Sequence, residues 1–133
     1  MQANAATCAQ HNFKTGNDIL ILHEIRHALQ RLLETGEETT IDLRALPMAP
    51  GEEAMIESAL GVGELSIRLD ALGPSTITET QFSGVWLVTH FNTEEEILGK
   101  FIEITRVPKL IIAQAEDMEH GLEQLRSKLS QSQ

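Results

Sequence analysis

The spacing of hydrophobic residues changes at Gly63, from the period of a helix before it to the period of a strand after it. Before Gly63, the pattern predicts a helix that starts at Asn17-Asp18, where short side chains can accept hydrogen bonds from free amides, and ends at Gly36. Its apolar residues recur at intervals of three and four, so we expect one buried face. That face comprises Leu22, Ile25, Leu29, Leu32 and Leu33.

Two shorter elements follow this helix. The β-branched stretch from Thr39 to Leu43 predicts a strand. Residues 51–60 predict a second helix, because Glu52 and Glu53 lie in its first turn, where the helix dipole favours negative charge. Gly61 ends that helix.

After Gly63 the sequence predicts four strands in succession. The first alternates apolar and polar residues, so we expect Leu65, Ile67 and Leu69 to share a buried face. The others are residues 75–82, 85–92 and 97–107, separated by short turns that favour an antiparallel meander. A short helix or turn at residues 109–114 and a final helix close the chain. The apolar side of that helix is Met118, Leu122, Leu125 and Leu129.

This order of elements predicts an α+β fold. We expect a mainly antiparallel meander sheet of four to five strands with about three helices packed on it. Residues 1–16 show no sustained periodicity and are interpreted as a mobile N-terminal tail. Residues 17–133 are interpreted as a single α+β domain.

The charge of the chain narrows the range of partners. Lys and Arg total 10 against 20 Asp and Glu, which gives a formal net charge of −10. Binding to nucleic acid phosphates or to an anionic membrane needs the opposite balance, so neither is expected as a partner. The single cysteine, Cys8, and the absence of a long apolar stretch lead us to expect a soluble, cytoplasmic protein.

One motif suggests a metal site. His23-Glu24-Ile25-Arg26-His27 matches H-E-x-x-H, in which two histidines on one helical face bind zinc and the glutamate acts as general base. Helical geometry, however, places both histidines well away from the expected buried face. We interpret the motif as a solvated helix face and expect no cofactor. The alternative is a zinc or nickel carrier domain that uses His23 and His27.

No nucleophile and base are recognisable together, so the sequence favours protein binding over catalysis. The strand at residues 85–92 carries apolar side chains on both faces, and Trp86, Leu87 and Phe91 are the candidate partner-binding residues. The alternative is that helices cover both faces of the sheet and that Trp86 belongs to the core.

The order of three segments resembles the C-terminal domain of the HupH/HyaF family of NiFe-hydrogenase expression and formation proteins. The segments are IDLRALPMAPGEEAMIESALGVGELSIRL, QFSGVWLVTHFN and FIEITRVPKLIIAQAEDMEHGLEQL, within about residues 40–125. The residues that carry the resemblance are Asp42-Leu43 with Pro47, the Leu60-Gly61 to Gly63-Glu64 junction, Gly84-Val85-Trp86, Pro108, Gln114 and Asp117.

The resemblance implies a cytoplasmic accessory role in hydrogenase biosynthesis, without an established active site. The expected activity is chaperone-like binding of the immature iron–sulfur small subunit of a NiFe hydrogenase, or of another accessory protein. Family members often carry a further region before this domain. A third hypothesis is a homodimer in which an exposed strand pairs with its own copy.

Overall fold

The structure is a computed structural model that describes residues 16–132. The predicted order of elements is confirmed. The elements are α2 (Asn17–Thr35), β1 (Thr39–Asp42), α3 (Glu52–Leu60), β2 (Ser66–Leu69), β3 (Ser75–Glu79), β4 (Val85–Phe91), β5 (Ile97–Ile104), a 3₁₀ turn (Lys109–Ile111) and α4 (Ala115–Gln131). Apart from Gly16, the predicted tail, including Cys8, lies outside the described residues.

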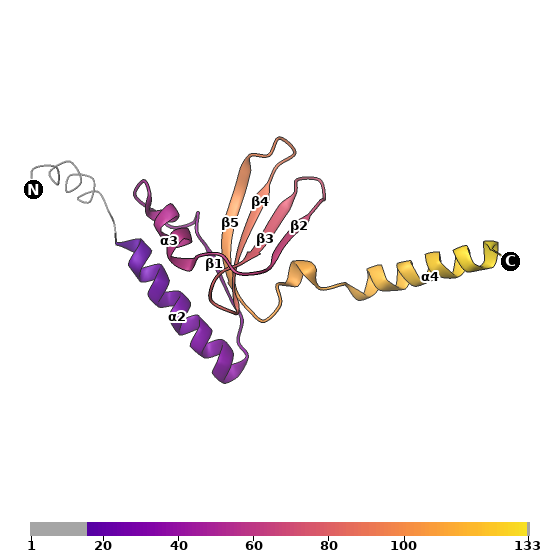
Figure 1. Cartoon of the computed structure of the whole chain (residues 1–133), viewed down its shortest axis with the longest axis horizontal. Helices are drawn as coiled ribbons and strands as arrows, with labels where there is room; N and C mark the ends of the chain where they lie inside the picture. Colours follow the sequence, from indigo (N-terminus) through magenta and orange to yellow (C-terminus); the bar gives the residue numbers. More distant parts are fainter. Residues whose placement is uncertain (1–15, 133) are drawn as a thin grey trace, which may run out of the picture.

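All five strands form one antiparallel sheet, which confirms the α+β class (Figure 1). Strands β2 to β5 make the predicted meander, and β1 adds to its far edge beside β5, giving the order β1-β5-β4-β3-β2. Strands β4 and β5 lie inside the sheet and are the longest, so they contribute the most side chains to each of its two faces. Within residues 16–132, no helix is both long and apolar enough to cross a bilayer.

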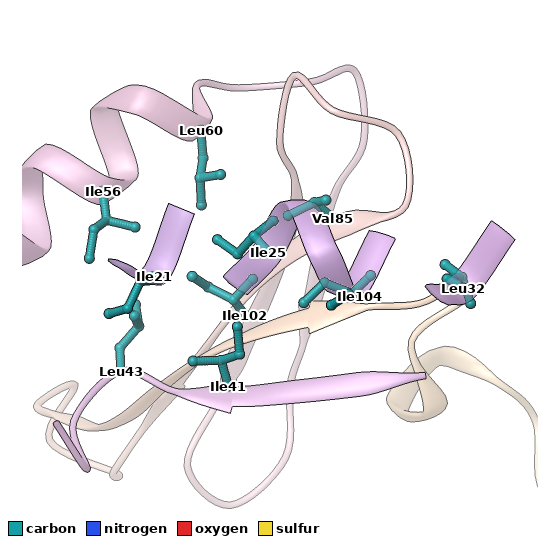
Figure 2. Close-up of a cluster of buried hydrophobic side chains, with 11 residues drawn as sticks. Ile21, Ile25, Leu32, Ile41, Leu43, Ile56, Leu60, Val85, Ile102 and Ile104 are labelled. Atoms are coloured by element: carbon teal, nitrogen blue, oxygen red, sulfur yellow. The ribbon is translucent and has the colours of Figure 1, made fainter. Parts of the chain in front are cut away.

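The main core lies between one face of the sheet and the helices α2 and α3. In Figure 2, Ile21 and Ile25 of α2 lie close to Ile102 of β5, and Ile56 and Leu60 of α3 extend the same cluster. The buried members are Ile21, Ile25, Ala28, Leu32, Ile41, Leu43, Ile56, Leu60, Val85, Ile102 and Ile104. The core is therefore almost entirely aliphatic, as the low aromatic content requires.

The buried face of α2 is rotated from the predicted one. Ile25 and Leu32 are buried as expected, but Leu22 and Leu29 lie at the margin of the core and Leu33 is 75% exposed. Ile21 and Ala28 take the buried positions instead. The helix opens with four consecutive aliphatic residues, Ile19 to Leu22, so several rotations of the stripe satisfied the sequence pattern equally well.

Two further expectations about burial are wrong. Strand β2 is an edge strand that no helix covers, and Leu65 and Leu69 are exposed while only Ile67 packs inward. Helix α4 forms where predicted, but it extends away from the sheet (Figure 1) and none of its residues is buried. Of the α-helices in residues 16–132, α2 and α3 therefore pack on the sheet and α4 does not.

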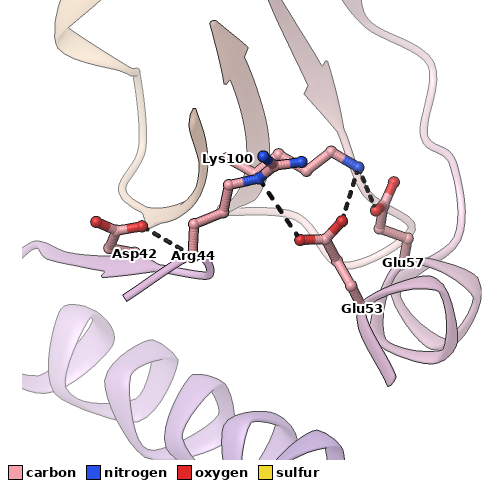
Figure 3. Close-up of polar contacts among 5 residues, drawn as sticks. All are labelled: Asp42, Arg44, Glu53, Glu57 and Lys100. Carbon is pink, nitrogen blue, oxygen red and sulfur yellow. Dashed lines mark hydrogen bonds and ion pairs between the residues drawn. The ribbon is translucent and has the colours of Figure 1, made fainter. Parts of the chain in front are cut away.

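A partly buried ion-pair cluster fixes α3 to the sheet (Figure 3). The Lys100 ammonium on β5 lies 2.7 Å from a carboxylate oxygen of Glu57 and 3.4 Å from one of Glu53. Burial alone would lower the pKa of Lys100, but the hydrogen bond and charge of Glu57, with Glu53, outweigh it and raise that pKa. The lysine side chain is only 13% exposed, so these contacts are poorly screened by water.

We predict that Lys100→Met lowers the free energy of unfolding by about 1–2 kcal/mol at neutral pH. The reason is that Glu57 loses its ion pair with Lys100, and Glu53 keeps only the longer contact with Arg44, at 4.0 Å. A lysine with a raised folded-state pKa stabilises the fold fully below its ordinary pKa of 10.5 and loses this effect as pH rises through the folded value. On the alkaline side, the stability deficit of the variant should therefore shrink only when the pH rises through the raised pKa of Lys100. Urea denaturation across pH measures it.

Arg68→Met is the matched control, because Arg68 and Asp70 also lie 2.7 Å apart but are both largely exposed. This variant should lose less than about 0.5 kcal/mol of its free energy of unfolding. Equal losses in the two variants would show that burial does not strengthen the Lys100 cluster.

Candidate functional site

The sheet face turned away from α2 and α3 carries a second apolar cluster. Its buried members are Ile77, Trp86 and Val88, and Ile67 and Phe101 pack against them. The Phe101 ring meets His90 edge to face with centroids 5.6 Å apart. Within residues 16–132 neither α2 nor α3 lies on this face, and the two aromatic residues Trp86 and Phe101 pack with the aliphatic ones.

Trp86 is held in place by the chain that follows β5. Its indole N–H donates a hydrogen bond to the carbonyl of Thr105 at 3.0 Å, and only 5% of the residue is exposed. The Thr105 amide in turn donates to the Gly84 carbonyl at 2.9 Å. The segment after β5 is thereby tied to the turn between β3 and β4, and the indole is enclosed between them.

A groove of about 530 Å³ opens beside this indole. Its lining includes Leu32 from the main core and Trp86 from the second cluster, so residues of both apolar clusters border it. We call it the Trp86 groove. It is lined mainly by apolar side chains, and several of them are exposed at its rim. The lining residues are Leu29, Leu32, Leu33, Leu65, Glu79, Ser83, Gly84, Trp86, Arg106, Val107 and Ile111.

A second apolar groove, of about 420 Å³, lies on the other side of the β3–β4 turn. It runs between α2 and the end of α3, and Phe82 of the turn forms part of its wall. Leu29 lines both grooves, so the two hollows are neighbours across α2. Together they make this end of the molecule a concave apolar surface, which is the form that ligand and partner sites usually take.

Next to the Trp86 cluster lies a small polar pocket that contains Glu103, the cross-strand partner of Trp86. Burial raises the pKa of the Glu103 carboxyl, and the charge of Glu38 adds to the rise, although His90 and Lys109 oppose it. The Thr105 hydroxyl donates a hydrogen bond to Glu38 in the same pocket. Ionised Glu103 in this polar pocket therefore lowers the stability of the fold.

The model of one protein family matches residues 16–132, which is the whole of the described chain. That family is described as the HupH hydrogenase expression protein, C-terminal conserved region. This chain belongs to that family. The HupH-type domain thus includes both grooves and α4.

Relatives of the domain agree with this assignment. The chain is 28% identical over 108 residues to the hydrogenase expression/formation protein HoxQ of Azotobacter vinelandii, and 26% identical over 110 residues to HupH of Rhizobium leguminosarum bv. viciae. These matches cover 80% and 83% of this chain but only 38% and 39% of the relatives. The chain therefore spans well under half the length of the curated relatives it matches.

A solved structure shares the fold as well. The hydrogenase expression protein HupH from Thiobacillus denitrificans ATCC 25259 superposes with a TM-score of 0.84 at 39% sequence identity. The superposition covers 89% of this chain and 98% of that one.

At two positions of the HupH-like pattern, the structure shows why the residue is glycine. A Cβ at Gly63 would lie 2.5 Å from the Thr80 carbonyl oxygen, so only glycine allows the chain to pass β3 here. Gly84 has φ of +89°, a conformation that favours glycine, and it forms the turn that places Trp86. Of these two positions, Gly84 also lines the Trp86 groove.

The structure separates the three predicted partner-binding residues. Trp86 is buried rather than exposed and forms part of the groove lining, while Leu87 lies on the opposite face against the main core. Phe91 is half-buried at the far end of β4. The three side chains therefore do not form one exposed patch, and their role in partner binding stays a prediction. Sequence alternation on β4 could not show that the chain after β5 covers the indole.

His23 and His27 are both exposed on α2, as the helical geometry predicts. The His27 ring lies 2.9 Å from the Arg26 guanidinium. Among residues 16–132, no group of three or more His, Cys, Asp and Glu side chains converges as a metal site would require. Whether the two histidines bind a metal stays a prediction.

We predict that Trp86→Phe lowers the free energy of unfolding by about 2 kcal/mol, because the buried Thr105 carbonyl loses its donor. Trp86 is the only tryptophan, so urea denaturation should be followed by circular dichroism rather than fluorescence. Phe82→Leu, at a half-exposed turn position, is the control and should change stability by less than about 0.5 kcal/mol. A Trp86→Phe variant as stable as the parent would show that the hydrogen bond does not hold the indole.

We predict that Glu103→Gln stabilises the domain at neutral pH. A carboxyl whose folded-state pKa lies above its ordinary value of 4.5 favours the fold below that value and loses this contribution as pH rises through the folded value. The gain from glutamine should therefore fade as the solution is acidified. Glu94→Gln, at the exposed β4–β5 turn, should give no gain at any pH. A pH-independent gain for Glu103→Gln would contradict the raised pKa.

Proposed function

We propose that this domain is a non-catalytic accessory protein in NiFe-hydrogenase maturation. It binds the immature iron–sulfur small subunit, or another accessory protein, through the Trp86 groove. The observation that carries the proposal is a concave apolar surface with exposed aliphatic side chains at its rim, in a domain whose relatives are called hydrogenase expression/formation proteins.

The rim of the groove supports partner binding on energetic grounds. Leu33, Leu65 and Val107 are between 45% and 75% exposed, and Ile111 is also exposed beside them. Covering such side chains yields roughly 25 cal/mol for each Å² of apolar surface removed from water. An exposed cluster of this kind, next to a preformed hollow, is typical of a surface that another chain covers.

The walls of the groove are more deeply buried than its rim. Trp86 is fixed by its hydrogen bond to Thr105, and Leu32 belongs to the main core. A preformed groove loses little conformational entropy when a partner binds, which favours affinity. Trp86 therefore acts in this proposal as a wall of the groove, while Leu33, Val107 and Ile111 make the first contacts.

The charge of the chain selects among partners. With a net charge of −10, the domain repels acidic proteins and attracts basic ones at long range. Glu79 and Arg106 place one charge of each sign at the groove itself, so a partner segment with polar residues flanking its apolar ones would fit. The partner we propose is thus an apolar segment of an incompletely assembled subunit, with basic residues around it.

We predict that Leu33→Ser and Val107→Ser each weaken capture of the small-subunit precursor by about tenfold or more, because each removes apolar contact at the rim. Binding should be measured by biolayer interferometry with the purified precursor. Both positions are exposed, so the variants should keep the melting temperature of the parent.

Leu72→Ser is the matched control, since Leu72 is 97% exposed in the β2–β3 turn and does not line the groove. It should bind like the parent. If all three variants captured the precursor equally, the Trp86 groove would not be the docking surface. If the unaltered domain captured neither the precursor nor any hydrogenase accessory protein, the proposed function would be wrong.

A further inference from the structure

Helix α4 exposes a complete apolar stripe to solvent. The exposed fractions are 62% for Met118, 49% for Leu122, 56% for Leu125 and 60% for Leu129. These four residues are spaced by four, three and four, so they lie along one side of the helix. A stripe of this kind normally faces a core or another helix, and here nothing in residues 16–132 covers it.

The helix is carried away from the rest of the molecule by the segment that precedes it. Ile112 and Gln114 both have extended backbone conformations, and α4 begins directly after them. In Figure 1 the helix points outward from the sheet. Its apolar stripe is therefore accessible along its whole length.

The spacing of the stripe is that of a short coiled coil. Met118 and Leu125 correspond to d positions, and Leu122 and Leu129 to a positions, of two successive heptads. In an antiparallel pair of such helices, a positions of one helix lie next to d positions of the other. Leu122 would then lie opposite Leu125 of a second copy, and Met118 opposite its Leu129.

The charges of α4 are divided along its length. Its four acidic residues, Glu116, Asp117, Glu119 and Glu123, come first, and its two basic residues, Arg126 and Lys128, come last. A parallel pair would bring like charges together, whereas an antiparallel pair places the acidic half of each helix beside the basic half of the other. The helix dipoles also oppose one another in that arrangement.

We propose that α4 pairs antiparallel with α4 of a second copy of this chain, through the stripe Met118, Leu122, Leu125 and Leu129. Glu119 and Arg126 each follow a d position, so they flank the stripe on the same side. In the pair, Glu119 of one copy lies beside Arg126 of the other, and the twofold symmetry makes this contact twice.

The choice of a second copy, rather than the hydrogenase partner, rests on this self-complementarity. A surface that pairs with itself must be complementary to itself, and the acidic-then-basic order of charges along α4 is complementary to its own reverse. The only ion pair within α4, between Arg126 and Glu123 at 3.0 Å, is exposed and leaves the stripe open. Gly121 borders the stripe on its other side, and a Cβ added there would meet no atom of the same copy within 4 Å. Because glycine has no side chain, it leaves room for a second helix at this position.

The pair should be weak and should depend on chain concentration. A helix of 17 residues is roughly 25 Å long and gives the seam only two heptads. We therefore expect a dissociation constant on the order of micromolar. The antiparallel pair would also place the end of each helix beside the start of the other, near the exposed Ile112.

The test is sedimentation equilibrium of the full chain with reductant present, so that Cys8 cannot form a disulfide. A monomer–dimer equilibrium is expected. Leu122→Glu and Leu125→Glu should each raise the dissociation constant at least about tenfold. These positions are not buried within one copy, so circular dichroism melts of the sheet domain should not change.

The double variant His120→Glu, Ser127→Glu is the matched control, because it adds negative charge to the opposite face of α4. It should dimerise more tightly than either stripe variant. A chain that stays monomeric to millimolar concentration would overturn the proposal, and so would a dimer that the stripe variants leave intact.

A charge exchange tests the direction of the pair. Glu119→Arg alone places two arginines together, and Arg126→Glu alone places two glutamates together, so each should weaken the dimer severalfold. The combined variant restores opposite charges and should recover most of the affinity, as should a mixture of the two single variants. A combined variant as weak as the sum of the single ones would exclude the antiparallel register.

Discussion

The sheet has two apolar faces but helices on only one of them, and this imbalance governs the rest of the structure. On the covered face, α2 and α3 bury an aliphatic core. On the other, Ile77 and Val88 must be shielded without a helix. Trp86 belongs to the same buried cluster, and its N–H bond to the Thr105 carbonyl keeps the chain after β5 against the indole. The Trp86 groove opens beside this contact, and Leu33, Leu65 and Val107 are exposed at its rim.

Much of the fold could be predicted from the sequence, because the local signals agreed with one another. Gly36 and Gly61 end α2 and α3 as expected, and period-two alternation located the strands of the meander. The pairing of β1 with β5 could not be predicted from the sequence. A short β-branched segment indicates a strand, but it does not indicate which edge of the sheet that strand joins. The rotation of α2 was equally hidden, because aliphatic residues occur around much of its first turn.

The candidate site was only partly accessible to sequence analysis. Trp86 was a candidate because it is the single tryptophan of the sequence. It does line the groove, but as a buried side chain and not as an exposed one. Burial of that kind depends on a contact with a segment about twenty positions later in the chain. The rim residues Leu33 and Val107 gave no signal, since an exposed aliphatic side chain looks like a core residue in the sequence. Likewise, the apolar stripe of α4 predicted that this helix packs against an apolar surface. The sequence could not show that the sheet of the same chain does not provide that surface.

Contact between the Trp86 groove and the hydrogenase partner is the central step of the proposed function. Hydrogen–deuterium exchange of the domain, with and without the small-subunit precursor, tests this contact without any substitution. We expect slower exchange on binding in residues 29–36 and 105–112, which border the groove, and little change in the β4–β5 turn at residues 92–96. Slowing confined to that turn or to α3, with the groove segments unaffected, would contradict the account.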